Sequence, residues 1–193
     1  DDGGRDRTEL KLGMTVDVDG GAITNTTTGS SATATRIRFG SELVGPVAAV
    51  DRAAGTLTVL GQTVKVAVET VFDEDLPGGL AAVTVGRIVE VYALFDAATG
   101  AYNATRIEPR ATAAQWRLRG PVSALDTGAK TLRIGAAAFS YASAPDVPAP
   151  LALGAFVRVR LNLALDANGR YVITAFGVGV RPPEDREEAS LKG

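Results

Sequence analysis

The sequence contains no cysteine and no histidine among its 193 residues. The absence of cysteine excludes a disulfide framework and thiolate metal sites. The absence of histidine excludes Ser-His-Asp and Cys-His catalytic sites and the usual zinc sites. A hydrolytic site built from carboxylates alone is still compatible with this composition. We therefore expect a protein that is not an enzyme and that binds no cofactor or metal.

Aromatic residues and positive charge are also scarce. Phe, Trp and Tyr make up 6% of the chain, and the net charge is −2. Non-specific nucleic-acid binding depends on surplus basic residues and on exposed stacking platforms, so a nucleic-acid partner is disfavoured. No apolar run approaches the roughly 20 residues of a membrane-spanning helix, so we expect no transmembrane segment.

What the sequence does contain is an internal repeat. Gly45-Pro46-Val47 recurs 75 residues later as Gly120-Pro121-Val122, and Thr56 to Val59 recurs at the same offset as Thr131 to Ile134. Self-similarity at a fixed period defines the architecture before any single motif is interpreted. The chain is therefore predicted to be a repeat protein.

Residues 10–40 match the second half of this repeat unit. Gly13 corresponds to Gly86 and Gly154, and the letters Ala34 to Ile37 return unchanged as Ala104 to Ile107. At the other end, the last three residues match the opening Leu-Val-Gly of the unit. The predicted organisation is a flexible lead-in, a half unit, two complete units, and a linker with the opening of a further unit or a donor strand: 1–9, 10–40, 41–110, 111–180 and 181–193.

Each complete unit shows three strand-like segments, a loop with a helical turn, and a closing two-stranded hairpin. This is the strand order of an OB-fold, a five-stranded partly open barrel, although continuous antiparallel β-structure also permits a sandwich. In the half unit, alternating residues predict strands at 10–18 and 32–39, joined by a long loop at 24–31. The predicted fold class is all-β: tandem OB-like small β-barrels, two complete units plus an N-terminal half unit.

Carboxylates are the remaining candidates for chemistry. Asp73, Glu74 and Asp75 are adjacent in a predicted turn, where a solvated acidic loop is the expected structure. A carboxylate-only hydrolase would need two acids about 5 to 10 Å apart in a cleft. Asp17 to Gly20 begins like a calcium loop but lacks the later ligands, so we expect a hairpin there.

Charged residues alternate along several strands. Arginines do so at Arg36 and Arg38, Arg117 and Arg119, and Arg158 and Arg160; this pattern fits a polar outward face, with an anion-binding face as the alternative. The Asp17 and Asp19 positions align with those of Arg158 and Arg160, so acidic and basic faces could join copies head to tail. The candidate inter-subunit contacts are Asp17, Asp19, Arg158, Arg160, Leu191 and Gly193.

Several segments of the sequence resemble a known protein family. Arg38 to Val47, Val59 to Val64, Val89 to Tyr92 and Ala104 to Pro109 resemble a bacterial domain-of-unknown-function family of exported proteins made of tandem OB-like β-barrel repeats. The resemblance covers roughly residues 10–180. It implies an extracytoplasmic location, at the cell surface, secreted or periplasmic, and it implies no known activity, so it assigns no functional residues.

Two functions of different class follow from these observations. The first is a non-enzymatic extracytoplasmic structural protein, a repeat rod that assembles into a fibre or a cell-surface or matrix polymer through self-association and strand pairing. The alternative is an OB-like binding module for an oligosaccharide or anionic polymer, such as a cell-surface polysaccharide. Exposed aromatic residues on the second and third strands of a barrel would favour the alternative, and an aliphatic face there would count against it.

Overall fold

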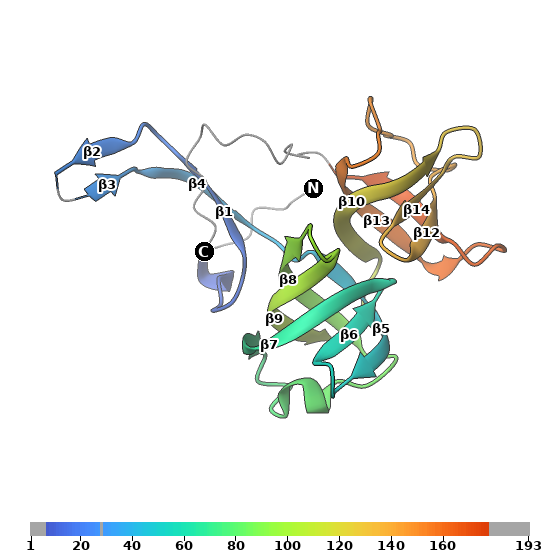
Figure 1. Ribbon diagram of the computed structural model, residues 1–193, viewed down its shortest axis with the longest axis horizontal. Helices are drawn as coiled ribbons and strands as arrows, with labels where there is room; N and C mark the ends of the chain where they lie inside the picture. The colour runs from blue at the N-terminus through green and yellow to red at the C-terminus, as the bar shows by residue number, and fades with distance from the viewer. Residues whose placement is uncertain (1–6, 28, 178–193) are drawn as a thin grey trace.

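The computed structural model describes residues 7–27 and 29–177, which are almost entirely β-structure (Figure 1). There are two short 3-10 helices in this part of the chain: η1 (Arg7–Glu9) precedes the first strand, and η2 (Gly79–Ala82) lies between two later strands. Neither of them, nor any other described segment, is a helix with the length and apolarity needed to cross a membrane. The strands are β1 (Val16–Gly20), β2 (Thr24–Thr26), β3 (Gly29–Ser31), β4 (Ala34–Phe39), β5 (Leu43–Asp51), β6 (Thr56–Val59), β7 (Gln62–Phe72), β8 (Ile88–Asp96), β9 (Ala101–Arg110), β10 (Trp116–Asp126), β11 (Thr131–Ile134), β12 (Ala137–Ser140), β13 (Phe156–Leu165) and β14 (Tyr171–Phe176).

Strands β5 to β9 form a closed barrel, which we call barrel 1. The pairing runs β5-β6-β7-β9-β8 and returns from β8 to β5, with β7 and β9 parallel and all other pairs antiparallel. Alternation places Leu57 and Val59 of β6 inside, at 1% and 0% exposure, while the intervening threonines are half-buried. The small all-β barrel predicted from the sequence is confirmed.

Strands β10 to β14 repeat this order as barrel 2. The pairing runs β10-β11-β12-β14-β13 and returns to β10, and β12 and β14 are again the parallel pair. Its interior is filled by large apolar side chains from all five strands, among them Leu118, Leu132, Phe139, Val159 and Ile173. The same connectivity therefore follows from the same sequence pattern in both units.

The two barrels meet through equivalent parts of their repeat units. Leu43 of β5 faces Leu118 of β10 in an antiparallel pair, and these residues occupy the same repeat position. The β11–β12 turn contacts the corresponding β6–β7 turn, where the Ala136 amide donates to the Gly61 carbonyl at 3.3 Å; these two positions are also equivalent. A local two-fold axis therefore relates the strands and turns at this contact, which makes it isologous.

The N-terminal strands lie outside the barrels. β1 and β4 pair with each other and, within the described residues, with no other strand; β2 and β3 extend the same hairpin into an arm that projects away from barrel 1 (Figure 1). The predicted loop at 24–31 is therefore wrong, because its threonines and serines pair across a ribbon. The predicted strand at 10–18 is also corrected, since residues 12–13 form a turn and the strand begins at Val16.

Candidate functional site

The β1–β4 hairpin has the register of a barrel's closing strands but lacks the rest of a barrel. Val18 faces Ile37, as Val91 faces Ile107 in barrel 1. In the barrel, both residues are fully buried, whereas Ile37 is 49% exposed and Val18 is half-buried. Residues that form a core in the complete unit are thus partly open to solvent in the hairpin.

The turn before β1 supports the same equivalence. Gly13, Gly86 and Gly154 have positive φ angles of 85°, 85° and 78°. In each turn the amide of the following residue donates to the carbonyl three positions back, at 3.2 Å. In the complete units the glycine amide also donates to the first strand, from Gly86 to Val47 and from Gly154 to Val122. The hairpin therefore has the local geometry that receives a first strand.

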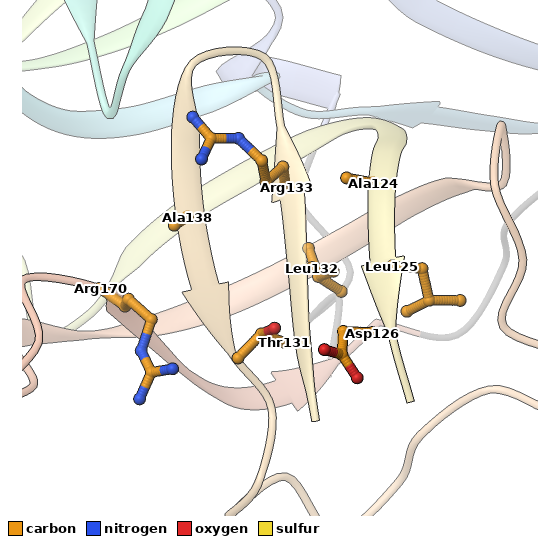
Figure 2. Close-up of a pocket in the computed structure, with 8 residues that line it drawn as sticks. All are labelled: Ala124, Leu125, Asp126, Thr131, Leu132, Arg133, Ala138 and Arg170. Carbon is orange, nitrogen blue, oxygen red and sulfur yellow. The ribbon is translucent and has the colours of Figure 1, made fainter. Parts of the chain in front are cut away.

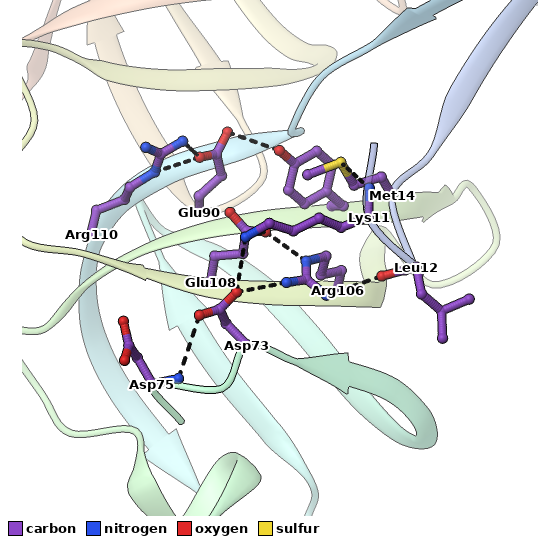
Figure 3. A network of polar contacts seen from close by, with 10 residues as sticks. Lys11, Leu12, Met14, Asp73, Asp75, Glu90, Arg106, Glu108 and Arg110 are labelled. Carbon is purple, nitrogen blue, oxygen red and sulfur yellow. Dashed lines mark hydrogen bonds and ion pairs between the residues drawn. The ribbon is translucent and has the colours of Figure 1, made fainter. Parts of the chain in front are cut away.

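A network of ion pairs attaches this turn to barrel 1, as Figure 3 shows. Arg106 is at its centre: Nη2 contacts Asp73 Oδ2 at 2.6 Å, and Nε contacts Glu108 Oε1 at 2.6 Å. Arg106 Nη1 also donates to the Leu12 carbonyl at 3.1 Å, and Lys11 Nζ lies 3.2 Å from Asp73. We call these residues the latch, because they hold the start of the hairpin against the barrel.

The charges of the latch are mutually compensated. Burial acts to raise the pKa of Asp73, but the Asp75 amide, Lys11 and Arg106 outweigh burial and lower that pKa. The hydrogen bond to Asp73 raises the pKa of Lys11. Gly13 lies so close to the barrel that a Cβ there would be 2.6 Å from the Thr105 carbonyl oxygen. The latch therefore joins hairpin and barrel through charge and through close backbone packing.

A second buried carboxylate lies where the barrels meet. The Glu90 side chain is fully buried; it accepts from Arg110 Nε at 2.6 Å and from Arg117 Nη2 at 3.0 Å. Burial acts to raise the pKa of Glu90, but the Ser41 hydrogen bond and the two arginines outweigh it, so the pKa is lowered. Because Arg110 belongs to β9 and Arg117 to β10, this carboxylate bridges the two barrels.

Glu42 is a third buried acid at the same junction, with a different electrostatic balance. Its Oε1 pairs with Arg119 Nη1 at 3.1 Å, while its buried Oε2 has no hydrogen-bond partner within the described structure. Burial dominates and raises the pKa of Glu42, although Arg119 and Arg158 act to lower it. Asp17 lies close enough to raise this pKa further. Glu42 is therefore a carboxylate that is costly to ionise.

The match to a known protein family lies in barrel 1. Residues 44–108 match the family model described as Domain of unknown function (DUF5666). The matched segment covers most of β5 to β9. No curated protein and no solved structure matches the chain. The predicted resemblance to a family of unknown function is thus confirmed for the DUF5666 segment, and export and tandem organisation stay predictions.

The predicted inter-subunit residues lie around one region of a single chain. Asp19 pairs with Arg38 at 2.7 Å, across the β1–β4 hairpin. Asp17 and Arg158 both lie near Glu42, although the sequence placed their faces at opposite ends. Arg160 faces Arg117 across β13 and β10. Leu191 and Gly193 lie outside the described residues, so contacts between copies stay predictions.

The acidic turn of the DUF5666 segment does not form a catalytic pair of exposed acids. Asp73 is engaged by Arg106 and Lys11, while Glu74 and Asp75 are at least partly exposed. Within residues 7–27 and 29–177, no cluster of three or more acidic side chains could hold a metal ion. Trp116 of β10 donates through its indole Nε1 to the Leu163 carbonyl of the same barrel at 3.1 Å.

A shallow pocket lies on the first three strands of barrel 2 (Figure 2). Its polar side chains are Asp126, Thr131, Arg133 and Arg170, and the rest of its lining is alanine and leucine: Ala124, Leu125, Leu132 and Ala138. OB-folds bind oligosaccharides and oligonucleotides on the face of strands two and three. An aliphatic lining without an aromatic platform there counts against an OB-type ligand site in this pocket.

Proposed function

We propose that this chain is a non-enzymatic structural protein that acts outside the cytoplasm and assembles by pairing strands with its unfinished hairpin. One observation carries the proposal: Ile37 is 49% exposed where its barrel equivalent Ile107 is 0% exposed. Burying such apolar surface is favourable by about 25 cal/mol per Å². The hairpin therefore gains stability from whatever strand completes it.

The β1–β4 hairpin is a two-stranded sheet, so each of its strands is an edge strand. Within the described residues β1 and β4 pair only with each other, so no second described strand lies along the outer edge of either. Such edges recruit strands from other chains unless they are covered. Addition of a strand to a sheet edge is a common mode of protein recognition, in which backbone hydrogen bonds give affinity and side-chain pockets give specificity.

The repeat predicts which strand fits and in which register. In barrel 1 Leu43 faces Val91 and Gly45 faces Val89, and barrel 2 pairs Leu118 with Val159 in the same way. Transferred to the hairpin, this register places a Leu opposite Val18, a Gly opposite Val16, and the residue between them opposite Asp17.

A segment with that pattern and a favourable charge is Leu191-Lys192-Gly193, which lies outside the described residues. We propose that this segment of a second copy begins the added strand, with Lys192 opposite Asp17. Opposite charges in directly facing cross-strand positions stabilise pairing by roughly 0.2 to 1 kcal/mol. The isologous contact between barrels uses the same surface on both units, so further growth needs a different surface such as this hairpin.

A charge exchange tests the proposal on the 193-residue chain. We expect sedimentation velocity and negative-stain electron microscopy to show particles that lengthen with protein concentration. Asp17→Lys or Lys192→Asp alone should reduce assembly, and the double variant should restore it. Asp146→Lys, in an exposed loop of barrel 2, is the control for charge alone. Monomers at every concentration would refute assembly, and failure of the double variant to recover would refute this register.

A further inference from the structure

Four arginines form a compact array on the outer face of barrel 2. Arg117 and Arg119 of β10 face Arg160 and Arg158 of β13 across the antiparallel pair. Their neighbours Leu118, Val157 and Val159 point into the barrel, so all four arginines emerge on the same side. We call these four residues the arginine array.

Like charges directly opposite one another destabilise a sheet, so the array needs compensation. Glu90 and Glu42 supply part of it, through Arg117 and Arg119. Arg160 is half-buried and, within residues 7–27 and 29–177, has no carboxylate at ion-pair distance. Arg160 therefore keeps hydrogen-bond donors that no carboxylate of the described residues engages.

The guanidinium groups are held in place by the protein. Arg119 lies over the Phe156 ring, 5.3 Å from its centroid, and its charge is fixed by Glu42. Arg117 is held by Glu90 and by Ser41 Oγ at 3.4 Å. The Arg158 stem packs against Gly177, where a Cβ would lie 3.0 Å from its Cδ. Cationic groups ordered in advance lose less conformational entropy when an anion binds.

We propose that the arginine array binds the anionic groups of an acidic polysaccharide. Planar guanidinium groups match carboxylates and sulfates by paired hydrogen bonds, and Arg160 is the group with unused donors. Residues 158 and 160 are two positions apart on one strand, which separates their backbones by about 7 Å. An extended polymer that contacts Arg160 along this strand therefore also passes the position of Arg158.

The chemistry of the surroundings favours a polysaccharide over a nucleic acid. Single-stranded nucleic acids are held by aromatic platforms within a basic groove. The aromatic ring at the array, Phe156, is half-buried and already has Arg119 over one face, so it does not offer an open stacking platform. This site differs from the pocket of Figure 2 and does not depend on strand acceptance by the hairpin.

Affinity electrophoresis and calorimetry with defined polymers test the proposal. The probes are polygalacturonate, which has carboxylates, heparin, which also has sulfates, neutral dextran, and single-stranded DNA. We expect the intact protein to bind one or both acidic polysaccharides, with affinity that falls as salt is added. Arg160→Gln should weaken binding about fivefold, the effect of losing a partly exposed charged contact, without altering the thermal midpoint.

A matched variant distinguishes the array from the OB-type face. Arg133→Gln removes an exposed arginine that lines the pocket on strands β11 and β12. If the array is the site, Arg133→Gln binds as the intact protein does. Loss of binding in Arg133→Gln but not in Arg160→Gln would assign the polymer to the pocket and overturn the proposal. Equal binding of DNA, or no binding by either acidic polysaccharide, would also overturn it.

Discussion

Replacing Glu90 with glutamine should destabilise the folded protein by about 2 kcal/mol at pH 7. Glutamine keeps the shape of the side chain but removes the negative charge opposite Arg110 and Arg117. It also replaces one acceptor oxygen with an NH2 group, which cannot accept a hydrogen bond from either arginine. Breaking a buried ion pair can cost about 3 to 5 kcal/mol when a charge remains buried. Here the arginines left behind are 43% and 38% exposed, so water can solvate them and the cost is lower.

The effect should depend on pH in a defined direction. Because the pKa of Glu90 is lowered on folding, its charge stabilises the folded state above the unfolded-state pKa near 4.5. This stabilisation is lost as the pH falls through the lower, folded-state pKa. The difference in stability between the intact protein and Glu90→Gln should therefore be largest at neutral pH and should shrink steadily below about pH 4.5.

Urea unfolding followed by circular dichroism, repeated from pH 7 to pH 3, measures this difference. A loss of about 2 kcal/mol corresponds to a fall in the thermal midpoint of about 4 to 8 °C for a chain of this size. Glu69→Gln, at an exposed position of β7, is the control and should leave stability nearly unchanged. Equal effects of the two substitutions, or a Glu90→Gln effect that persists at pH 3, would contradict the assigned role of the buried charge.

Two further substitutions test the latch and the barrel contact by the same unfolding measurement. Arg106→Leu leaves the half-buried Asp73 and the buried Glu108 with only a lysine beside them and should cost about 3 kcal/mol. A loss below about 1 kcal/mol would show that the latch is not a stabilising ion-pair network. Gly120→Ala should cost about 1 to 3 kcal/mol because its Cβ would overlap a tyrosine hydroxyl from barrel 1, whereas Gly128→Ala, whose Cβ would lie 3.4 Å from its nearest neighbour, should be almost neutral.

The barrels could be predicted from the sequence because their signals are periodic. Strands such as Thr56–Val59 alternate between polar and apolar residues, and the offset of 75 residues transfers each assignment to the second unit. The Thr24–Ser31 arm was missed because small polar residues pair across a ribbon without an apolar face to indicate it. Alternation of polar and apolar residues therefore predicts strands that bury one apolar face, and it does not predict strands that bury no face.

The buried charges could not be predicted from alternation. An acidic or basic residue between apolar neighbours on a strand indicates an outward position, and an outward position in an isolated barrel is exposed to solvent. Glu90 becomes fully buried only because the second barrel covers that face and brings Arg117 from 27 residues away. The sequence repeat shows that the units are alike, but it does not show which faces meet.

The two turns at the centre of the barrel contact have diverged in a complementary way. Gln62 reaches across to the Ile134 carbonyl at 2.7 Å and occupies space that exists because residue 135 is glycine. In the repeat, the large Gln62 of barrel 1 corresponds to the small Ala137 of barrel 2, and the large Leu60 of barrel 1 corresponds to Gly135 of barrel 2. Barrel 1 therefore has the larger side chain at both positions, and barrel 2 has the smaller one. Two copies of barrel 1 placed in this arrangement would bring Gln62 against Leu60, and two copies of barrel 2 would leave a gap. Each barrel therefore favours a partner of the other type over an identical barrel, so this surface does not join like barrels of different copies.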